Sequence, residues 1–231
     1  MGLNRRFVFV SVLLMGLGLV CHGQSQVKDT KHNLSVSGPG RFKSTSETEI
    51  CKFCHTPHSA KPRNPLWNHE LSAVSHYRTY RSPSFEPAVQ GDQALVIDGT
   101  SRLCLSCHDG TVALGAMVNG KGKNSADSAR DRGLGAMPPS ARGFIGTDLS
   151  GSHPISFSVS ESLVARNNAK DTLLNSLAEM KADPDVHLDE NGKVQCTTCH
   201  SVHSDKNFQS SGIHFWAKQS FNDVCTVCHR L

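Results

Sequence analysis

Apolar positions form few periodic runs along this chain, and segments rich in Gly, Pro, Ser and Asn separate them. The stretches Ala94–Asp98 and Ile155–Val159 predict short strands. Asp171–Ala182 predicts a helix, because its apolar residues recur at the spacing of one helical face. These residues are Leu173, Leu174, Leu177 and Met180. Gly115–Ser125 and Gly133–Gly146 predict loops, so we expect little regular structure overall.

The N-terminal segment combines a basic start with a continuous apolar run. Two arginines precede Phe7–Val20, whose 14 residues are fewer than a membrane span requires. This pattern is typical of a secretory signal peptide, and the small residue Gly23 favours cleavage there, so we expect residues 1–23 to be removed on export. A lipid-bearing Cys21 is an alternative, although the bulky Val20 before it disfavours that reading. No later stretch is apolar enough to span a bilayer.

Four Cys-x-x-Cys-His pentapeptides use eight of the nine cysteines. This pentapeptide is the signature of c-type haem attachment, in which two thiols become thioethers and the histidine becomes the proximal iron ligand. We therefore expect four covalently attached haem c groups. The attachment residues are Cys51, Cys54, Cys104, Cys107, Cys196, Cys199, Cys225 and Cys228, and the proximal ligands are His55, His108, His200 and His229.

Paired cysteines have three other uses besides haem attachment. Structural zinc, a redox dithiol and a set of four disulfides would each employ such pairs. None of them requires a histidine directly after the second cysteine. Histidine makes up 13 of 231 residues, so composition alone makes four such matches rare and favours haem.

The composition indicates that cofactors form much of the core. Aromatic residues make up 6% and hydrophobic residues 37% of the chain, which is low for a compact globule of this size. Four porphyrins would add large apolar surfaces for burial. The expected fold class is a multihaem cytochrome c, mostly irregular coil with a few short helices and minimal strand, wrapped around a stack of four haems. Within the tetrahaem domain, residues 24–231, we expect one haem pair over 24–150 and another over 151–231.

The charge balance limits the class of partner. The formal net charge is +4, and ionised haem propionates would make the holoprotein mildly acidic. A basic surface for nucleic acid is therefore not indicated.

The sixth ligand of each iron separates electron transfer from ligand chemistry. Methionine is scarce after the signal segment, whereas histidines exceed the need, so ligation of every iron by two histidines is feasible. His58 and His203 each follow a proximal histidine by three residues and could reach a haem stacked beside the first. His32 and His153 complete the tentative distal set, and for all four the alternative is a histidine that only forms hydrogen bonds. The lower-ranked histidines are His69, His76, His187 and His214.

Several blocks of sequence between and around the motifs carry a family resemblance. In chain order they read CKFCHTPH at 51–58, PLWN at 65–68, CLSCHDGTVA at 104–113 and HPISF at 153–157. They resemble the paired C-x-x-C-H multihaem cytochromes, and within these the OmcE-type tetrahaem cytochromes that polymerise into extracellular filaments. The resemblance covers nearly all of the chain after the signal segment. The intervening blocks give it more specificity than the haem motifs alone.

The resemblance implies that two histidines bind each iron and that the haems stack in a continuous chain. It implies that His203 serves the fourth haem and His58 the second. His32 and His153 would then serve the first and third, with one ligand possible from a neighbouring subunit. The segment from Val186 to Val194 and the surroundings of His214 depart from the family pattern.

The expected function is electron conduction in extracellular respiration, by a protein with no catalytic residue. The alternatives are a soluble periplasmic electron shuttle and a multihaem oxyanion reductase, which would need an iron with an open site. The expected partners are copies of the chain itself in a filament, and other redox proteins or extracellular electron acceptors, but no nucleic acid. The expected location is extracellular or at the cell surface, with the periplasm as the alternative.

Overall fold

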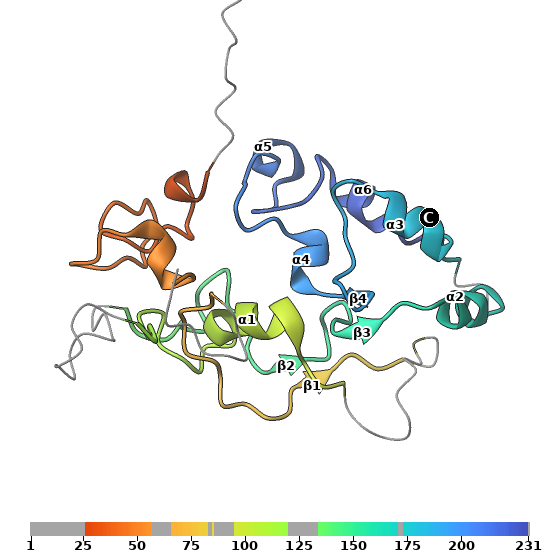
Figure 1. The fold of residues 1–231 in the computed structure, drawn as a ribbon, viewed down its shortest axis with the longest axis horizontal. Coiled ribbons are helices and arrows are strands. Elements are labelled where there is room, and N and C mark those ends of the chain that lie inside the picture. Colours follow the sequence, from red (N-terminus) through yellow and green to blue (C-terminus); the bar gives the residue numbers. More distant parts are fainter. Residues whose placement is uncertain are drawn as a thin grey trace, which may run out of the picture.

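The computed structural model describes residues 26–56, 66–82, 85, 95–119, 134–170 and 173–230. Within these ranges the chain is mostly coil with short helices and little strand (Figure 1), as the sequence predicted. The N-terminal segment predicted to be a signal peptide and His58 lie outside the described residues. The helical elements are η1 (Val27–Asp29), η2 (Ile50–Phe53), α1 (Gly99–His108), α2 (Glu161–Asn168), α3 (Leu177–Ala182), α4 (Cys196–Cys199), α5 (Phe208–Ser211) and α6 (Phe221–Cys225).

Two pairs of two-residue strands connect distant segments. β1 (Arg78–Thr79) runs parallel to β2 (Asp148–Leu149), with Arg78 opposite Asp148. β3 (Phe157–Ser158) runs antiparallel to β4 (Lys193–Val194), with Phe157 opposite Val194. Because β4 ends two residues before α4, the second pair holds the third motif against the middle of the chain.

One of the two strand predictions is confirmed and the other is wrong. The prediction at Ile155–Val159 is confirmed in shortened form as β3. The prediction at Ala94–Asp98 is wrong for residues 95–98, which are coil and lead directly into α1. Asp98 is the N-cap residue of that helix, and its backbone N–H donates to Ser156 Oγ at 3.2 Å. Residues 95–98 therefore form the coil that precedes α1, and this coil is held by polar contacts instead of by pairing with a strand.

The predicted helix at 171–182 begins later than its apolar pattern indicated. α3 starts after Ser176, whose hydroxyl accepts from Glu179 N while the Glu179 carboxylate accepts from Ser176 N, a capping box. The residues before it are extended against the C-terminal motif, where Asn175 N donates to Cys228 O at 2.9 Å. Leu174 is consequently buried as part of an extended pairing, while Leu173 is 47% exposed.

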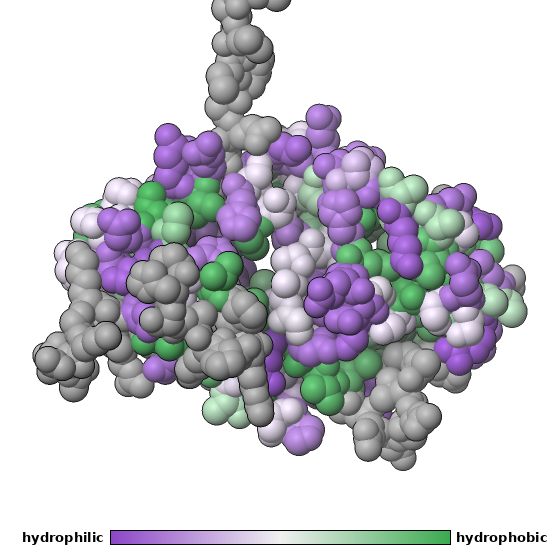
Figure 2. All heavy atoms as spheres, viewed as in Figure 1, coloured by the Kyte–Doolittle hydropathy of each residue, from purple (hydrophilic) through white to green (hydrophobic). Residues whose placement is uncertain are grey.

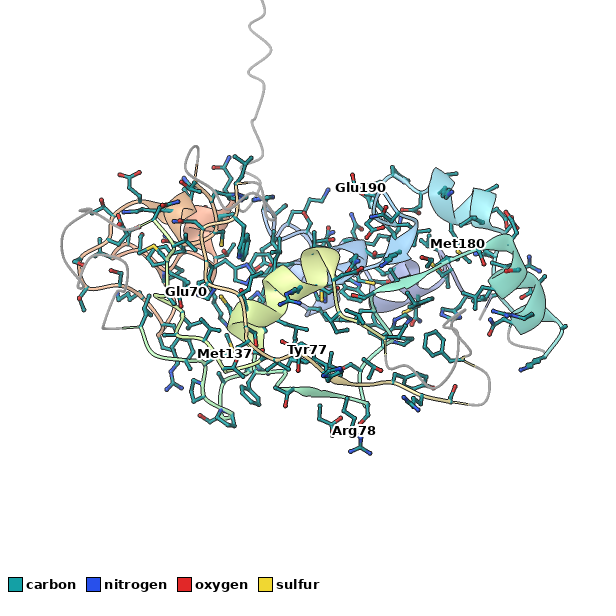
Figure 3. All side chains as sticks on the ribbon, turned by 60° about the horizontal axis from the view of Figure 1, so that its bottom comes forward. Glu70, Tyr77, Arg78, Met137, Met180 and Glu190 are labelled. Carbon is teal, nitrogen blue, oxygen red and sulfur yellow. The ribbon has the colours of Figure 1, made fainter. Side chains whose placement is uncertain are left out.

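Apolar side chains form five small clusters in the described part of the chain rather than one continuous core. Motif cysteines pack at the edges of three of these clusters. Cys54 and Cys107 lie against one cluster, Cys199 against a second and Cys228 against a third. In Figure 3, Met180 of the third cluster lies at the opposite end of the molecule from Met137, which packs on the first. The core is thus distributed along the line of motifs.

The surface mixes both kinds of side chain. Figure 2 shows hydrophobic residues emerging between hydrophilic ones at several separate places on one face. The most exposed of the large apolar side chains described are Val96, at 69%, and Phe221, at 56%. Of the helices described, none combines the length and the apolar character needed to cross a bilayer.

Candidate functional site

Each pentapeptide motif lies on one helical turn. The backbone N–H of the histidine donates to the carbonyl of the first cysteine in three motifs, at 2.8 Å for His55, 3.1 Å for His200 and 2.9 Å for His229. The remaining motif forms the last turn of α1, which ends at His108. Residues three and four apart share one face of a helix. The two cysteines of a motif are three residues apart and therefore lie on one side of the turn, and the histidine follows at its end.

Three of the four proximal histidines face a second histidine from a distant part of the chain. The ring centroids of His55 and His203 are 5.9 Å apart, with 21° between the ring planes. Those of His108 and His32 are 6.0 Å apart at 71°. The rings of His229 and His153 form the third pair, 6.3 Å apart at 77°. Every distal candidate within the described residues is thus paired with a proximal histidine.

The spacing of these pairs fits an iron between the rings. A histidine nitrogen binds a metal at about 2 Å, so two imidazoles on opposite sides of one ion have centroids roughly 6 Å apart. Rings in direct contact are closer, as His214 and Phe208 show with centroids at 3.8 Å and planes 4° apart. No three His, Cys, Asp or Glu side chains among the described residues converge to hold a bare metal ion. Paired imidazoles fit haem, because the porphyrin supplies the other four donors.

Three of the paired histidines favour the neutral form that binds metal. Burial, and after it the nearby His108, lowers the pKa of His32 to about 4. Burial and His203 lower the pKa of His55, and burial and His153 lower the pKa of His229. These three rings therefore keep a nitrogen lone pair available near neutral pH.

Backbone carbonyls orient three of the candidate ligands. Nδ1 donates to Gly143 O at 2.7 Å in His108, to Pro154 O at 2.8 Å in His153 and to His214 O at 3.3 Å in His200. A protonated Nδ1 leaves Nε2 as the ligating atom, and such contacts orient metal-bound histidines. The sequence did not predict these partners. Every residue has a backbone carbonyl, so residue type does not show which carbonyl accepts a hydrogen bond from a histidine.

A buried turn supports the second proximal histidine. Asp109 accepts from the Tyr77 hydroxyl at 2.7 Å and from the N–H and hydroxyl of Thr111, both at 2.8 Å. Burial alone would raise the pKa of Asp109, but the hydrogen bonds from Thr111 and Tyr77 lower it below its usual value. Gly110 follows with φ at +75°, a conformation that favours glycine. The chain therefore reverses sharply just after His108.

The pairs differ from those that the family resemblance implies. His203 lies opposite the first proximal histidine rather than the fourth, His32 opposite the second rather than the first, and His153 opposite the fourth rather than the third. His200 of the third motif meets the edge of Trp216, with centroids 5.2 Å apart, and faces no histidine among the described residues. His58, the remaining distal candidate, falls in the segment 57–65 outside the described residues.

The lower-ranked histidines have other surroundings. His69 is 2% exposed, and its two ring nitrogens contact Glu70 O at 2.8 Å and Ala113 O at 3.0 Å. His214 pairs with Asp205 at 2.7 Å. His76 and His187 are exposed. Nδ1 of His69 also lies 3.1 Å from Ser106 Oγ, and Nε2 lies 3.6 Å from Cys107 Sγ, so the buried ring packs beside the second motif.

Motif cysteines are neighbours of cysteines in the next motif. All eight are free thiols in the described chain. Burial and the nearby Cys54 raise the pKa of Cys107 to about 12, and burial and the nearby Cys228 raise the pKa of Cys199 to about 12. A hydrogen bond between Cys104 and Cys196 links the second and third motifs and raises the pKa of Cys104. In Figure 1 the four motif-bearing turns follow one another across the long axis in chain order.

Comparison with known proteins assigns no family to this chain. Neither the family models nor the curated proteins contain a match to it. The function is therefore argued from the residues of the site.

Proposed function

We propose that this chain is a tetrahaem c-type cytochrome that transfers electrons. The observation that carries the proposal is the set of three facing histidine pairs, with centroids 5.9 to 6.3 Å apart, each including the histidine of a C-x-x-C-H turn. The motif supplies two thiols and one imidazole, and a remote segment supplies the second imidazole. This combination is the ligand set of a bis-histidine haem c.

The residues of the chain have distinct roles in this proposal. When bound, haem iron supplies the one-electron couple between Fe(III) and Fe(II). The cysteines would hold each porphyrin to its helical turn, and the histidines would bind the iron and keep water and substrate away from it. Carbonyl contacts to Nδ1 keep the rings oriented. Histidine on both sides also favours a lower reduction potential than a histidine and methionine pair.

The same closure favours electron transfer over catalysis. A reductase would need an iron with an open axial position. Three proximal histidines have a facing partner among the described residues. We therefore propose that the protein is not an enzyme and has no catalytic residue.

Haem content and spin state test this function. We expect the purified, exported protein to carry four covalent haems, detected as added mass on the polypeptide and by haemochrome absorption. We expect low-spin spectra in both oxidation states and no rapid binding of carbon monoxide, because two imidazoles occupy each iron. Fewer than four haems, or a high-spin haem that binds carbon monoxide readily, would contradict the proposal.

We further propose that the protein is exported and assembles into extracellular filaments. The support is the signal-like segment Phe7–Val20 and the family resemblance of the motif blocks. The succession of motifs along the long axis is compatible with a conduit from end to end (Figure 1). Negative-stain electron microscopy of the holoprotein distinguishes the alternatives, because filaments support a conduit and uniform monomers at high concentration support a periplasmic shuttle.

A further inference from the structure

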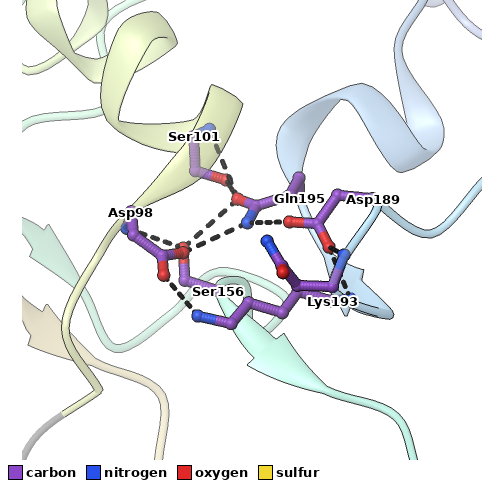
Figure 4. Close-up of polar contacts among 7 residues, drawn as sticks. Asp98, Ser101, Ser156, Asp189, Lys193 and Gln195 are labelled. Carbon is purple, nitrogen blue, oxygen red and sulfur yellow. Dashed lines mark hydrogen bonds and ion pairs between the residues drawn. The ribbon is translucent and has the colours of Figure 1, made fainter. Parts of the chain in front are cut away.

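A buried polar network joins the second and third motifs at the centre of the molecule (Figure 4). Its central residue is Gln195, which is 1% exposed and directly precedes α4. The carbonyl oxygen of its side chain accepts from Ser101 Oγ at 2.5 Å, from Ser101 N at 3.3 Å and from Ser156 Oγ at 3.3 Å. Its amide nitrogen donates to Asp98 at 3.2 Å and to Asp189 at 2.9 Å. Both ends of the amide are fully used.

The network connects the two haem-bearing helices directly. Ser101 lies in the first turn of α1, three residues before Cys104 and therefore on the same helical face. Its hydroxyl also accepts from Cys196 N at 3.0 Å, at the start of α4. The hydroxyls of Thr100 and Thr197 form a parallel contact at 2.7 Å. Hydrogen bonds thus set the position of α4 against α1.

Two further features show that the starts of α1 and α4 are in close contact. Gly99 has φ at +52°, and a Cβ at this position would lie 2.6 Å from Gln195 Nε2. Lys193 forms an ion pair with Asp98. The Asp98 carboxylate, which accepts a hydrogen bond from the Gln195 amide, is therefore also balanced by a positive charge. A side chain at residue 99 would therefore displace the amide group of Gln195 from its present position.

We propose that Gln195 is a positioning residue that sets the distance between the second and third haems and thereby the rate of electron transfer across the middle of the molecule. The inference rests on the proposed function. The attachment cysteines nearest the network, Cys104 and Cys196, belong to those two motifs and lie on the two helices that the network joins. The intervening chain of 91 residues is too long to keep these two cysteines close together. The buried contacts at their helix starts do so instead.

The test replaces Gln195 by leucine in the full holoprotein. Leucine has a similar size but provides no hydrogen bond to Ser101, Asp98 or Asp189. The measurement is two-dimensional NMR exchange spectroscopy of partly reduced protein with assigned haem methyl signals. We expect exchange between the second and third haems to slow several-fold relative to the other neighbouring pairs, because the rate of electron transfer falls steeply with the distance between two haems. Gln209→Leu, at an exposed glutamine in α5, should leave all exchange rates unchanged.

A structural role alone would give a different result. Lower stability would change all exchange rates together or reduce haem content, whereas a positioning role changes one rate while four low-spin haems remain. Gln195→Glu places two carboxylates next to each other at residues 189 and 195. Adding Asp189→Asn restores a hydrogen bond between an amide and a carboxylate, and the double variant should therefore recover the rate more than Gln195→Glu alone. If Gln195→Leu does not mature, Ser101→Ala removes the hydroxyl shared by Gln195 and Cys196 and should slow the same step.

Unchanged relative exchange in Gln195→Leu or Ser101→Ala, with all four haems present and low-spin, would overturn the inference while leaving the proposed function intact. A wild-type protein that lacks four covalent haems would instead overturn the proposed function. The two failures are therefore distinguishable in the same set of preparations.

Discussion

His203→Ala is expected to convert one of the four haems to a high-spin form that binds carbon monoxide. The reason is the pairing of His203 with His55, whose ring centroids are 5.9 Å apart. Both histidines are exposed, so water can reach the position that His203 leaves. Absorption and electron paramagnetic resonance spectra measure the high-spin fraction. Added imidazole should restore the low-spin spectrum, because the vacated position accepts a small ligand.

The identity of the altered haem discriminates between two pairings. The geometry predicts the haem of the first motif, whereas the family resemblance implies the haem of the fourth. Assigned haem methyl signals in paramagnetic NMR identify which haem changes. His76→Ala, at an exposed histidine that contacts only Ser75 in the described chain, is the matched control and should keep four low-spin haems. An entirely low-spin His203→Ala protein would show that His203 is not a ligand.

Residues 24–231 produced without haem are expected to lack cooperative folding. The described apolar side chains form five separate clusters, and motif cysteines lie at the edges of three of them. Burial contributes about 25 cal/mol per Å² of apolar surface, so loss of four porphyrins removes much of the favourable free energy. Small separate clusters do not offset the entropy of ordering so much coil. We expect weak near-ultraviolet circular dichroism and no sharp calorimetric transition.

The holoprotein, measured under the same conditions, is the reference for this experiment. It should show strong near-ultraviolet signals and a cooperative transition. A haem-free chain that melts as sharply, at a similar temperature, would indicate that the protein core forms independently of the cofactors. That outcome would contradict the view that porphyrins are part of the core.

Local patterns predicted the parts of the site that lie close together in sequence. The two cysteines and the histidine of a motif lie together because a five-residue turn places them there, as His229 and its hydrogen bond to Cys225 show. Glycine- and proline-rich segments predicted coil for the same local reason. Ser176 and Glu179 form a capping box, a local signal for the start of α3, whereas the apolar stripe begins earlier, at Leu173.

The histidine pairs could not be read from the sequence. His32 faces His108 from 76 positions away, and that approach depends on how the intervening coil folds. Spacing near a motif made His58 and His203 good candidates, but it contains no information on which iron each would reach. The role of Gln195 was also missed. A polar residue next to a motif resembles any surface residue until its burial is known.

The separation of the apolar clusters has a consequence for how such a chain can lengthen during evolution. A single shared core resists insertions, since every added side chain must fit those already packed. Here three of the clusters pack against motif cysteines, and each of these three combines residues far apart in sequence, such as Phe53 and Leu134 in the first. An insertion in the coil would therefore require repacking of a few side chains in a small cluster rather than of one common core.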